Sequence, residues 1–217
     1  AVTALAHVTC VSTPRAQTHR TLSLLREAGV ENILALRGDL PADGSPACAD
    51  FAHASDLIEE INRFGGFCVG GACYPEGHPE SPNKQADLDG IRKKVDSGCA
   101  FLTTQMFFDN NILYNFLFRL LKHGINVPVV AGIMPITNVR QVKRTFALSG
   151  ANLPPRFRAI VDRFGDDPAA MKQAGIAYAT EQIIDLIANG VSHVHIYTMN
   201  QPDIAGRIIG NLSEIFR

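Results

Sequence analysis

The sequence lacks the features that mark several specialised classes of protein. Its 217 residues carry a formal net charge of only -1, so neither nucleic acid nor an anionic membrane surface is indicated as a partner. No apolar run reaches the roughly 18 residues of a membrane-spanning helix. The N-terminus has neither the charged start nor the long apolar stretch of a signal peptide. The composition, with 46% hydrophobic residues, is sufficient for one sizeable core.

Cysteine is scarce, and its spacing gives no sign of a disulfide framework. The chain has five cysteines, an odd number, and none of them forms a CxxC pair. They are Cys10, Cys48, Cys68, Cys73 and Cys99. Because reduced thiols persist in reducing compartments, we expect a cytoplasmic protein.

Strand-like apolar runs alternate with amphipathic helical stretches along the whole chain. The runs are nearly continuous, as expected for strands covered on both faces. We expect strands at residues 5–11, 33–37, 67–73, 101–108, 127–134 and 193–199. Helical spacing predicts helices at 16–28 and 84–97, a helix capped by Asn138, and a long helix opened by Asp167. This alternation indicates a parallel sheet in a single domain covering residues 1–217.

Two parallel architectures compete for this pattern. A doubly wound sheet usually has a glycine-rich phosphate loop after its first strand, but residues 12–15 have no GxGxxG spacing. A (β/α) barrel instead gathers polar residues at the carboxyl ends of many strands, as this chain does. We therefore predict an α/β fold of the (β/α)8 TIM-barrel type, with about six of its eight βα units in this chain. Because the sequence opens almost on a strand, we expect the other units to precede residue 1.

The first candidate site is the tripeptide Arg37, Gly38 and Asp39, at the end of the second expected strand. Glycine lets a ligand approach the backbone closely. Arginine offers a planar fork to a phosphate or a ring edge, and aspartate offers a fixed negative charge to a cationic or amino-bearing substrate. A surface salt bridge at a turn explains the same three residues, so position alone leaves both interpretations open.

A second candidate is the proline-stiffened loop 74–80, which carries Tyr74 and His78. An aromatic ring beside a histidine suits stacking and hydrogen bonding to a cofactor ring, and an ordered surface turn is the alternative. A metal site is a weaker hypothesis, because no second histidine stands at a matching spacing. Asp87 and Lys94 share one face of the next helix, which is either solvated or suited to a ribityl chain or a phosphate.

Gln105 falls inside the fourth expected strand, among apolar neighbours. An amide donates and accepts at once, which suits the edge of a pterin or flavin, although a satisfied core amide explains it equally well. The spacing of the residues does not indicate a Ser/His/Asp triad, a Cys/His pair, a phosphate loop or a Schiff-base lysine. The residues alone thus indicate a barrel enzyme with a charged, ring-shaped substrate at the carboxyl ends of its strands.

Seven short motifs, taken in order, resemble those of one enzyme family. They are HVTC (7–10), ALRGDLP (35–41), YPEGHPE (74–80), QADLDGIRKKVDSGC (85–99), TTQMFFD (103–109), GIMPITN (132–138) and HIYTMN (195–200). Each motif is weak alone, but together they look like methylenetetrahydrofolate reductase over nearly the whole chain. The resemblance implies a (β/α)8 barrel with FAD as cofactor. Such an enzyme takes a hydride from NADH or NADPH and reduces 5,10-methylenetetrahydrofolate to 5-methyltetrahydrofolate.

The resemblance also implies a role for each matching residue. Asp39 would be catalytic, because its carboxylate would bind the amino-pyrimidine edge of the folate and stabilise the cationic iminium formed on ring opening. The implied cofactor-binding residues are His7, Arg37, Gly38, Asp39, Ala54, Tyr74, His78, Asp87 and Lys94. The implied substrate-binding residues are Asp39, Gln105 and Gln141. We expect no metal, nucleic-acid or membrane partner, and a homo-oligomer is compatible with the sequence.

Three departures from the family pattern bear on activity. The family's general acid is a glutamate on its first barrel strand, in a segment like EFFPP, and this chain has no such segment. Gln201 stands where many members have an arginine, and Thr145 stands near where an aromatic often covers the nicotinamide. We therefore expect either a piece of a longer reductase or a chain that runs the folate half-reaction poorly. A non-catalytic flavin- or folate-binding remnant and a partner subunit completed by another polypeptide are the alternatives.

Overall fold

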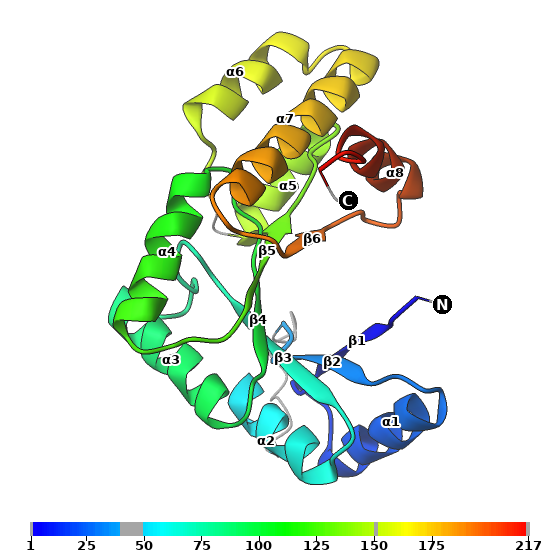
Figure 1. Cartoon of the computed structure of the whole chain (residues 1–217), viewed down its shortest axis with the longest axis vertical. Helices are drawn as coiled ribbons and strands as arrows, with labels where there is room; N and C mark the ends of the chain where they lie inside the picture. The colour runs from blue at the N-terminus through cyan, green and yellow to red at the C-terminus, as the bar shows by residue number, and fades with distance from the viewer. Residues whose placement is uncertain (1, 40–49, 150–151, 216–217) are drawn as a thin grey trace. The chain divides into compact units, whose positions relative to one another are not determined.

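The computed structural model describes residues 2–39, 50–149 and 152–215 (Figure 1). Its strands and helices alternate from β1 to α5, as the sequence predicts, whereas three helices stand in succession between β5 and β6. In chain order they are β1 (Leu5–Thr9), α1 (Arg15–Glu27), β2 (Asn32–Leu36), α2 (Ala54–Phe64), β3 (Cys68–Cys73), α3 (Lys84–Asp96), β4 (Phe101–Thr104), α4 (Asn110–Lys122), β5 (Val129–Ile133), α5 (Val139–Ser149), α6 (Pro155–Phe164), α7 (Pro168–Ala188), β6 (Val194–Ile196) and α8 (Pro202–Asn211). Of the five cysteines, Cys48 lies outside the described residues.

The order of the strands in the sheet is their order in the chain, β1-β2-β3-β4-β5-β6. The pairings of β1 with β2, of β2 with β3 and of β5 with β6 are parallel. A doubly wound sheet reverses its strand order at a switch point, so this sequential order excludes that alternative. The α/β fold of the TIM-barrel type that the sequence predicts is therefore confirmed.

The chain forms two compact units. The first comprises residues 1–73, 82–103 and 124–129, and the second comprises residues 74–81, 104–123 and 130–217. The carboxyl ends of β1, β2 and β3 thus belong to the first unit. The loop after β3 and the segments that follow β4 and β5 belong to the second. The predicted site residues are consequently divided between the two units.

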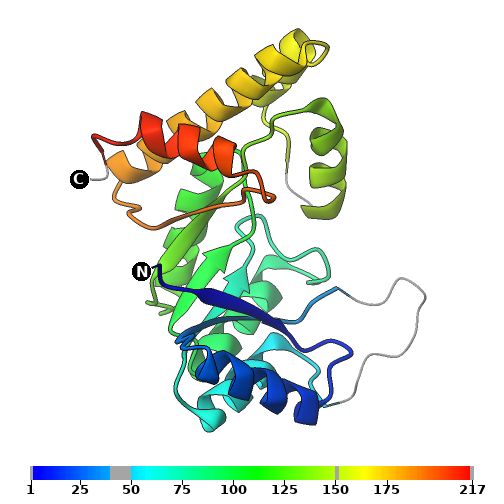
Figure 2. The ribbon, with the colours of Figure 1, turned by 90° about the vertical axis from the view of Figure 1, so that its right-hand side faces the viewer.

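The first unit is built around the apolar strand β2. Ile33, Leu34 and Ala35 are all buried, and α2 packs on β2 and β3. Strand β1 runs beside β2 with Thr9 opposite Leu36, and the helices α1 and α2 lie side by side next to this strand pair (Figure 2). The continuous burial of β2 is what its uninterrupted apolar run predicts.

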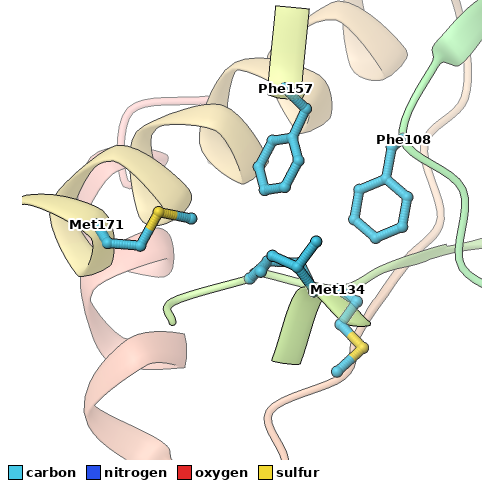
Figure 3. Close-up of a cluster of buried hydrophobic side chains, with 6 residues drawn as sticks. Phe108, Met134, Phe157 and Met171 are labelled. Carbon is cyan, nitrogen blue, oxygen red and sulfur yellow. The ribbon is translucent and has the colours of Figure 1, made fainter. Parts of the chain in front are cut away.

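The second unit is held by a cluster of large apolar side chains near the long helix α7. Phe108, Met134, Phe157 and Met171 belong to this cluster, and each is at most 7% exposed (Figure 3). They come from the segments after β4 and β5 and from α6 and α7. Because α7 also contacts α8, the cluster joins most helices of this unit into one core. Within the described ranges, no helix is both long and apolar enough to cross a lipid bilayer.

The helix caps predicted from the sequence are formed. The Asn138 Oδ1 accepts the Gln141 N–H at 2.9 Å, and the Asp167 Oδ1 accepts the Ala169 N–H at 2.9 Å. These bonds satisfy backbone donors that have no partner within the first helical turn. The sequence pattern does not predict the helices α2, α4, α6 and α8, which the structure adds to the alternation.

The apolar run 101–108 predicts one strand, but β4 ends at Thr104. Phe107 and Phe108 leave the sheet and are buried instead, at 0% and 2% exposure. An apolar run can reflect burial in a core as well as strand pairing, and periodicity does not separate the two. The prediction that Gln105 lies inside a strand is therefore wrong, since Gln105 lies in the loop that follows β4.

Gly175 lies where α7 passes closely over the segment that follows β5. A Cβ atom at this position would collide with the Ile136 carbonyl oxygen. We expect Gly175→Ala to lower the free energy of unfolding by about 1–3 kcal/mol, because the two backbone segments must move apart. Urea unfolding followed by circular dichroism measures the loss.

Gly206→Ala in α8 is the matched control. A Cβ atom there meets no described atom within 4 Å. This substitution should raise the free energy of unfolding by about 0.5–1 kcal/mol, because alanine restricts the unfolded chain. Equal effects of the two substitutions would contradict the close approach at Gly175.

Candidate active site

The carboxyl ends of β1 and β2 are tied together beside Gly38. The Arg37 carbonyl oxygen accepts the Val11 N–H at 2.7 Å and the Cys10 N–H at 3.2 Å. Gly38 has a φ of 87°, and a Cβ atom there would come within 2.8 Å of Val11 Cγ1. The packing of the chain and its left-handed backbone therefore require this glycine, a different reason from the ligand approach that the sequence suggests.

The polar residues around Gly38 differ in their exposure. His7 on β1 and Asp39 after β2 are exposed, whereas Arg37 is partly buried and its Nε donates to the Gly38 carbonyl oxygen at 3.3 Å. The end of β2 thus offers both a carboxylate and a guanidinium. Ala54 begins α2 and is 7% exposed, so its side chain belongs to the core of the first unit.

Lys94 reaches from α3 to the end of β3. Its Nζ donates to the Ala72 carbonyl oxygen at 2.6 Å, and burial lowers the pKa of its ammonium group below the usual 10.5. The Asp87 carboxylate opposes this pKa shift, and the Arg37 guanidinium adds to it. Arg37 and Asp87 therefore both lie close enough to Lys94 to influence its pKa. The sequence spacing predicts this only for Asp87 and Lys94.

Two buried thiols occupy the space near this lysine. Burial raises the pKa of Cys73 and raises that of Cys99 to about 11, so both thiols stay protonated near neutral pH. A Cβ atom on Gly71 would come within 3.2 Å of Cys99 Sγ and 3.5 Å of Lys94 Cδ. The two cysteines are therefore packing groups of this site, and their thiols are poor nucleophiles.

The loop 74–81, which follows β3, is anchored within the second unit. Arg119 of α4 donates to the Pro75 carbonyl oxygen at 2.9 Å. The Asn152 backbone N–H donates to Glu76 Oε1 at 3.0 Å. The sequence did not predict these two hydrogen bonds. The one feature of the sequence that could have indicated them is that Glu76 lies in the same loop as the candidate residues. Two donors from other segments thus fix the path of the loop.

Tyr74 and His78 contact each other within this loop. Their rings lie edge to face, with centroids 4.5 Å apart. The His78 Nδ1 accepts the Glu80 N–H at 3.2 Å. Among the described residues, no three His, Cys, Asp or Glu side chains are grouped so that they could hold a metal ion. The loop thus presents a tyrosine ring beside a histidine, as the sequence predicts.

Gln105 and Gln141 both use their carboxamide oxygens inside the second unit. Gln105 Oε1 accepts the Met106 N–H at 2.9 Å, and Gln141 Oε1 accepts the Thr137 N–H at 2.8 Å. The second bond, together with the Asn138 cap, closes the turn into α5. Each glutamine also carries an NH2 group that can donate to a ligand.

The second unit also contains a cavity of about 510 Å³ that the sequence does not predict. Asn110, Arg156, Glu181 and Asp185 are among the residues that line it. Asn110 Nδ2 donates to Asp185 Oδ2 at 2.6 Å, and Arg156 forms an ion pair with Glu181. These charged groups are thus partnered within the protein.

Comparison with known proteins identifies the family of this chain. The sequence profile for methylenetetrahydrofolate reductase matches residues 1–213. The chain belongs to the methylenetetrahydrofolate reductase family. It is 32% identical over 206 residues to the 5,10-methylenetetrahydrofolate reductase of Pectobacterium carotovorum subsp. carotovorum, a match that covers 95% of this chain and 68% of that protein. The resemblance carried by the seven motifs is thereby confirmed.

Other members of the methylenetetrahydrofolate reductase family are much longer than this chain. It is 38% identical over 202 residues to methylenetetrahydrofolate reductase 2 of Saccharomyces cerevisiae, a match that covers 89% of this chain and 34% of the yeast protein. Among solved structures, an uncharacterized protein from Clostridium thermocellum that binds two copies of 5-methyl-5,6,7,8-tetrahydrofolic acid has a TM-score of 0.57 at 12% identity, covering 96% of this chain and 71% of that one. This likeness shows a shared fold.

The burial of Lys94 predicts how stability depends on pH. Its pKa in the folded protein is below the usual 10.5, so between these two pKa values the unfolded chain binds more protons. The contribution of Lys94 to stability therefore becomes more favourable as pH rises through that interval. The free energy of unfolding of the unsubstituted protein, minus that of Lys94→Met, should increase in urea unfolding as the pH rises toward the usual lysine pKa of 10.5.

Lys93→Met removes an equivalent charge from the exposed face of the same helix and is the control. It reports the effect of net charge on unfolding under identical conditions. A difference between the unsubstituted protein and Lys94→Met that stays constant, or falls as pH rises, would show that Lys94 is not held in a buried site.

Proposed function

We propose that the chain carries the catalytic barrel of a methylenetetrahydrofolate reductase. With FAD as cofactor and NAD(P)H as reductant, it would convert 5,10-methylenetetrahydrofolate to 5-methyltetrahydrofolate. The observation that carries the proposal is the position of Lys94, whose Nζ donates to the Ala72 carbonyl oxygen near the end of β3 and whose pKa responds to Asp87 and Arg37. The names of the relatives supply the reaction class, and the name of the Clostridium thermocellum protein supplies a precedent for folate binding on this fold.

The charged residues of the first unit fit the polar part of FAD. The diphosphate of this cofactor is anionic, and Arg37 and Lys94 supply two cations that act on one another. The Lys94 Nζ is already held by the Ala72 carbonyl oxygen, so its position is set before a ligand arrives. Asp87 can accept hydrogen bonds from ribityl hydroxyl groups. We assign the ribityl and diphosphate contacts to these three side chains.

The loop 74–81 carries the residues that the family resemblance assigns to the cofactor ring. Tyr74 and His78 lie edge to face, and Arg119 anchors the loop that carries them. A ring that is already fixed loses little conformational entropy when it meets a flat ligand. Of the other implied cofactor positions, Gly38 and Ala54 would act through the packing of the first unit, since Gly38 fits beside Val11 and Ala54 is buried.

The remaining residues would act on the substrate. When bound, FAD would take a hydride from NAD(P)H and return it to the folate. Asp39, an exposed carboxylate after β2, would stabilise the positive charge that develops on the folate as its imidazolidine ring opens. Gln105 and Gln141 would donate from their NH2 groups to the folate or the nicotinamide. The protein thus orients both substrates and offsets charge where it forms.

Flavin binding and flavin reduction test the proposal in sequence. The purified protein, mixed with FAD and passed over a desalting column, should retain a yellow chromophore. NADH or NADPH should bleach it in the absence of oxygen, and 5,10-methylenetetrahydrofolate should restore the colour. A bound flavin that neither nucleotide bleaches would favour the alternative of a non-catalytic binding module. Failure to bind flavin at all would contradict the proposal.

Asp39→Asn should separate the two half-reactions. We expect reoxidation of the reduced flavin by 5,10-methylenetetrahydrofolate to slow by about 100-fold, the scale of losing one electrostatic stabiliser of a transition state. Reduction of the flavin by NADH should change much less, because only the folate step develops cationic charge on the substrate. Stopped-flow absorbance measures each step by itself.

Asp89→Asn is the control for this variant, since it removes another exposed carboxylate from the first unit. It should leave both half-reactions near their original rates. Equal slowing of the two half-reactions by Asp39→Asn would remove the basis for its assignment.

A further inference from the structure

Two side chains of α7 hold the loop that carries Gln105. Tyr178 Oη donates to the Phe108 carbonyl oxygen at 2.6 Å, and Gln182 Nε2 donates to the Phe107 carbonyl oxygen at 3.0 Å. The two donors are one helical turn apart on the same face of α7, so one rigid element holds two successive carbonyl groups. Gln182 is only 7% exposed, and its bond lies in the protein interior.

The Phe108 side chain of the same loop is also held in place. The Phe108 ring packs against those of Phe146 and Phe157, with centroids 4.8 and 5.7 Å away. Phe108 and Phe157 face each other in the core of the second unit (Figure 3). Tyr178 meets the Phe157 ring edge to face at 4.8 Å, so the residue that binds the loop carbonyl also packs in the core beside it. The loop therefore has little freedom to move away from α7.

The residue before Gln105 is anchored from other elements. Thr104 Oγ1 accepts the Gly132 N–H at 2.8 Å, and the Thr104 carbonyl oxygen accepts a hydrogen bond from Tyr197 Oη at 2.8 Å. Gln105 is thus flanked on both sides by backbone that side chains hold in place. Its own Oε1 accepts the Met106 N–H, which fixes the direction of the carboxamide.

We propose that Tyr178 and Gln182 are positioning residues, which act through the backbone of the loop and set the direction in which Gln105 presents its NH2 group. This inference rests on the proposed function, in which Gln105 donates to the folate or the nicotinamide. The two α7 side chains need no contact with substrate to do this. A carboxamide turned away from its productive direction loses that hydrogen bond, and substrate binding weakens.

Tyr178→Phe and Gln182→Met test the proposal, because each removes one donor while keeping most of the side-chain volume. The Met106 amide reports on Gln105 directly, since its acceptor is Gln105 Oε1. In the double variant we expect this amide to exchange with deuterium about tenfold faster, in protein without any substrate. Each single variant should show about a threefold effect, so the test does not depend on the double variant folding.

Steady-state kinetics give the second readout. The KM for 5,10-methylenetetrahydrofolate should rise about tenfold in the double variant, the scale of losing one hydrogen bond. The Kd for FAD should stay unchanged, because Gln105 is assigned to substrate and not to cofactor. A general loosening of the second unit would weaken both.

Tyr114→Phe is the matched control. It also removes a tyrosine hydroxyl that bridges to α7, since Tyr114 Oη donates to Asp185 Oδ2 at 2.7 Å, but this bond does not involve the Gln105 loop. Met106 exchange and the KM should both stay unchanged in this variant.

Three results would overturn the proposal. One is unchanged Met106 exchange in the double variant, whatever its activity. Another is faster exchange with an unchanged KM, and the third is a parallel loss of FAD affinity. Inactivity of the unsubstituted protein would count against the proposed function alone, because the exchange measurement uses neither cofactor nor substrate.

Discussion

The hydrogen-bonding demand of backbone groups at the ends of the strands is the constraint on which the rest of this structure depends. A carbonyl group that has left the sheet needs another donor, because an unpaired buried carbonyl costs free energy. Tyr178 supplies that donor for Phe108, which follows β4, and Lys94 donates to the carbonyl oxygen of Ala72 near the end of β3. The residues that complete the fold at these ends therefore also determine which polar groups a ligand would meet.

Lys94 shows how this constraint connects stability to binding. Its side chain is partly buried, and this burial, together with the positive charge of Arg37, lowers the pKa of its ammonium group. The Asp87 carboxylate opposes this pKa shift. An anionic ligand at this place would offset the cost of keeping two cations together. Ligand binding and folding stability would then be linked at the same residues.

Sequence reasoning located the candidate residues better than it explained them. The sequence suggests that a ligand approaches the backbone at Gly38. In the structure, a Cβ atom on Gly38 would instead come within 2.8 Å of Val11 Cγ1. Gln105 reads as part of a strand, because the phenylalanines after it are as apolar as strand residues, although they fill a core. The Gln182 bond to the loop after β4 could not be foreseen, because residues far apart in sequence form it.

The sequence by itself determined the alternation of strands and helices, the sequential parallel sheet and the family, because these follow from periodicity and local motifs. It also determined which residue types stand at the strand ends. Only the tertiary structure decided which of them act on one another, as Arg37 does on Lys94, and which way the Gln105 carboxamide turns. Burial and hydrogen-bond partners depend on contacts between segments that are far apart in the sequence. Local sequence patterns do not specify these contacts.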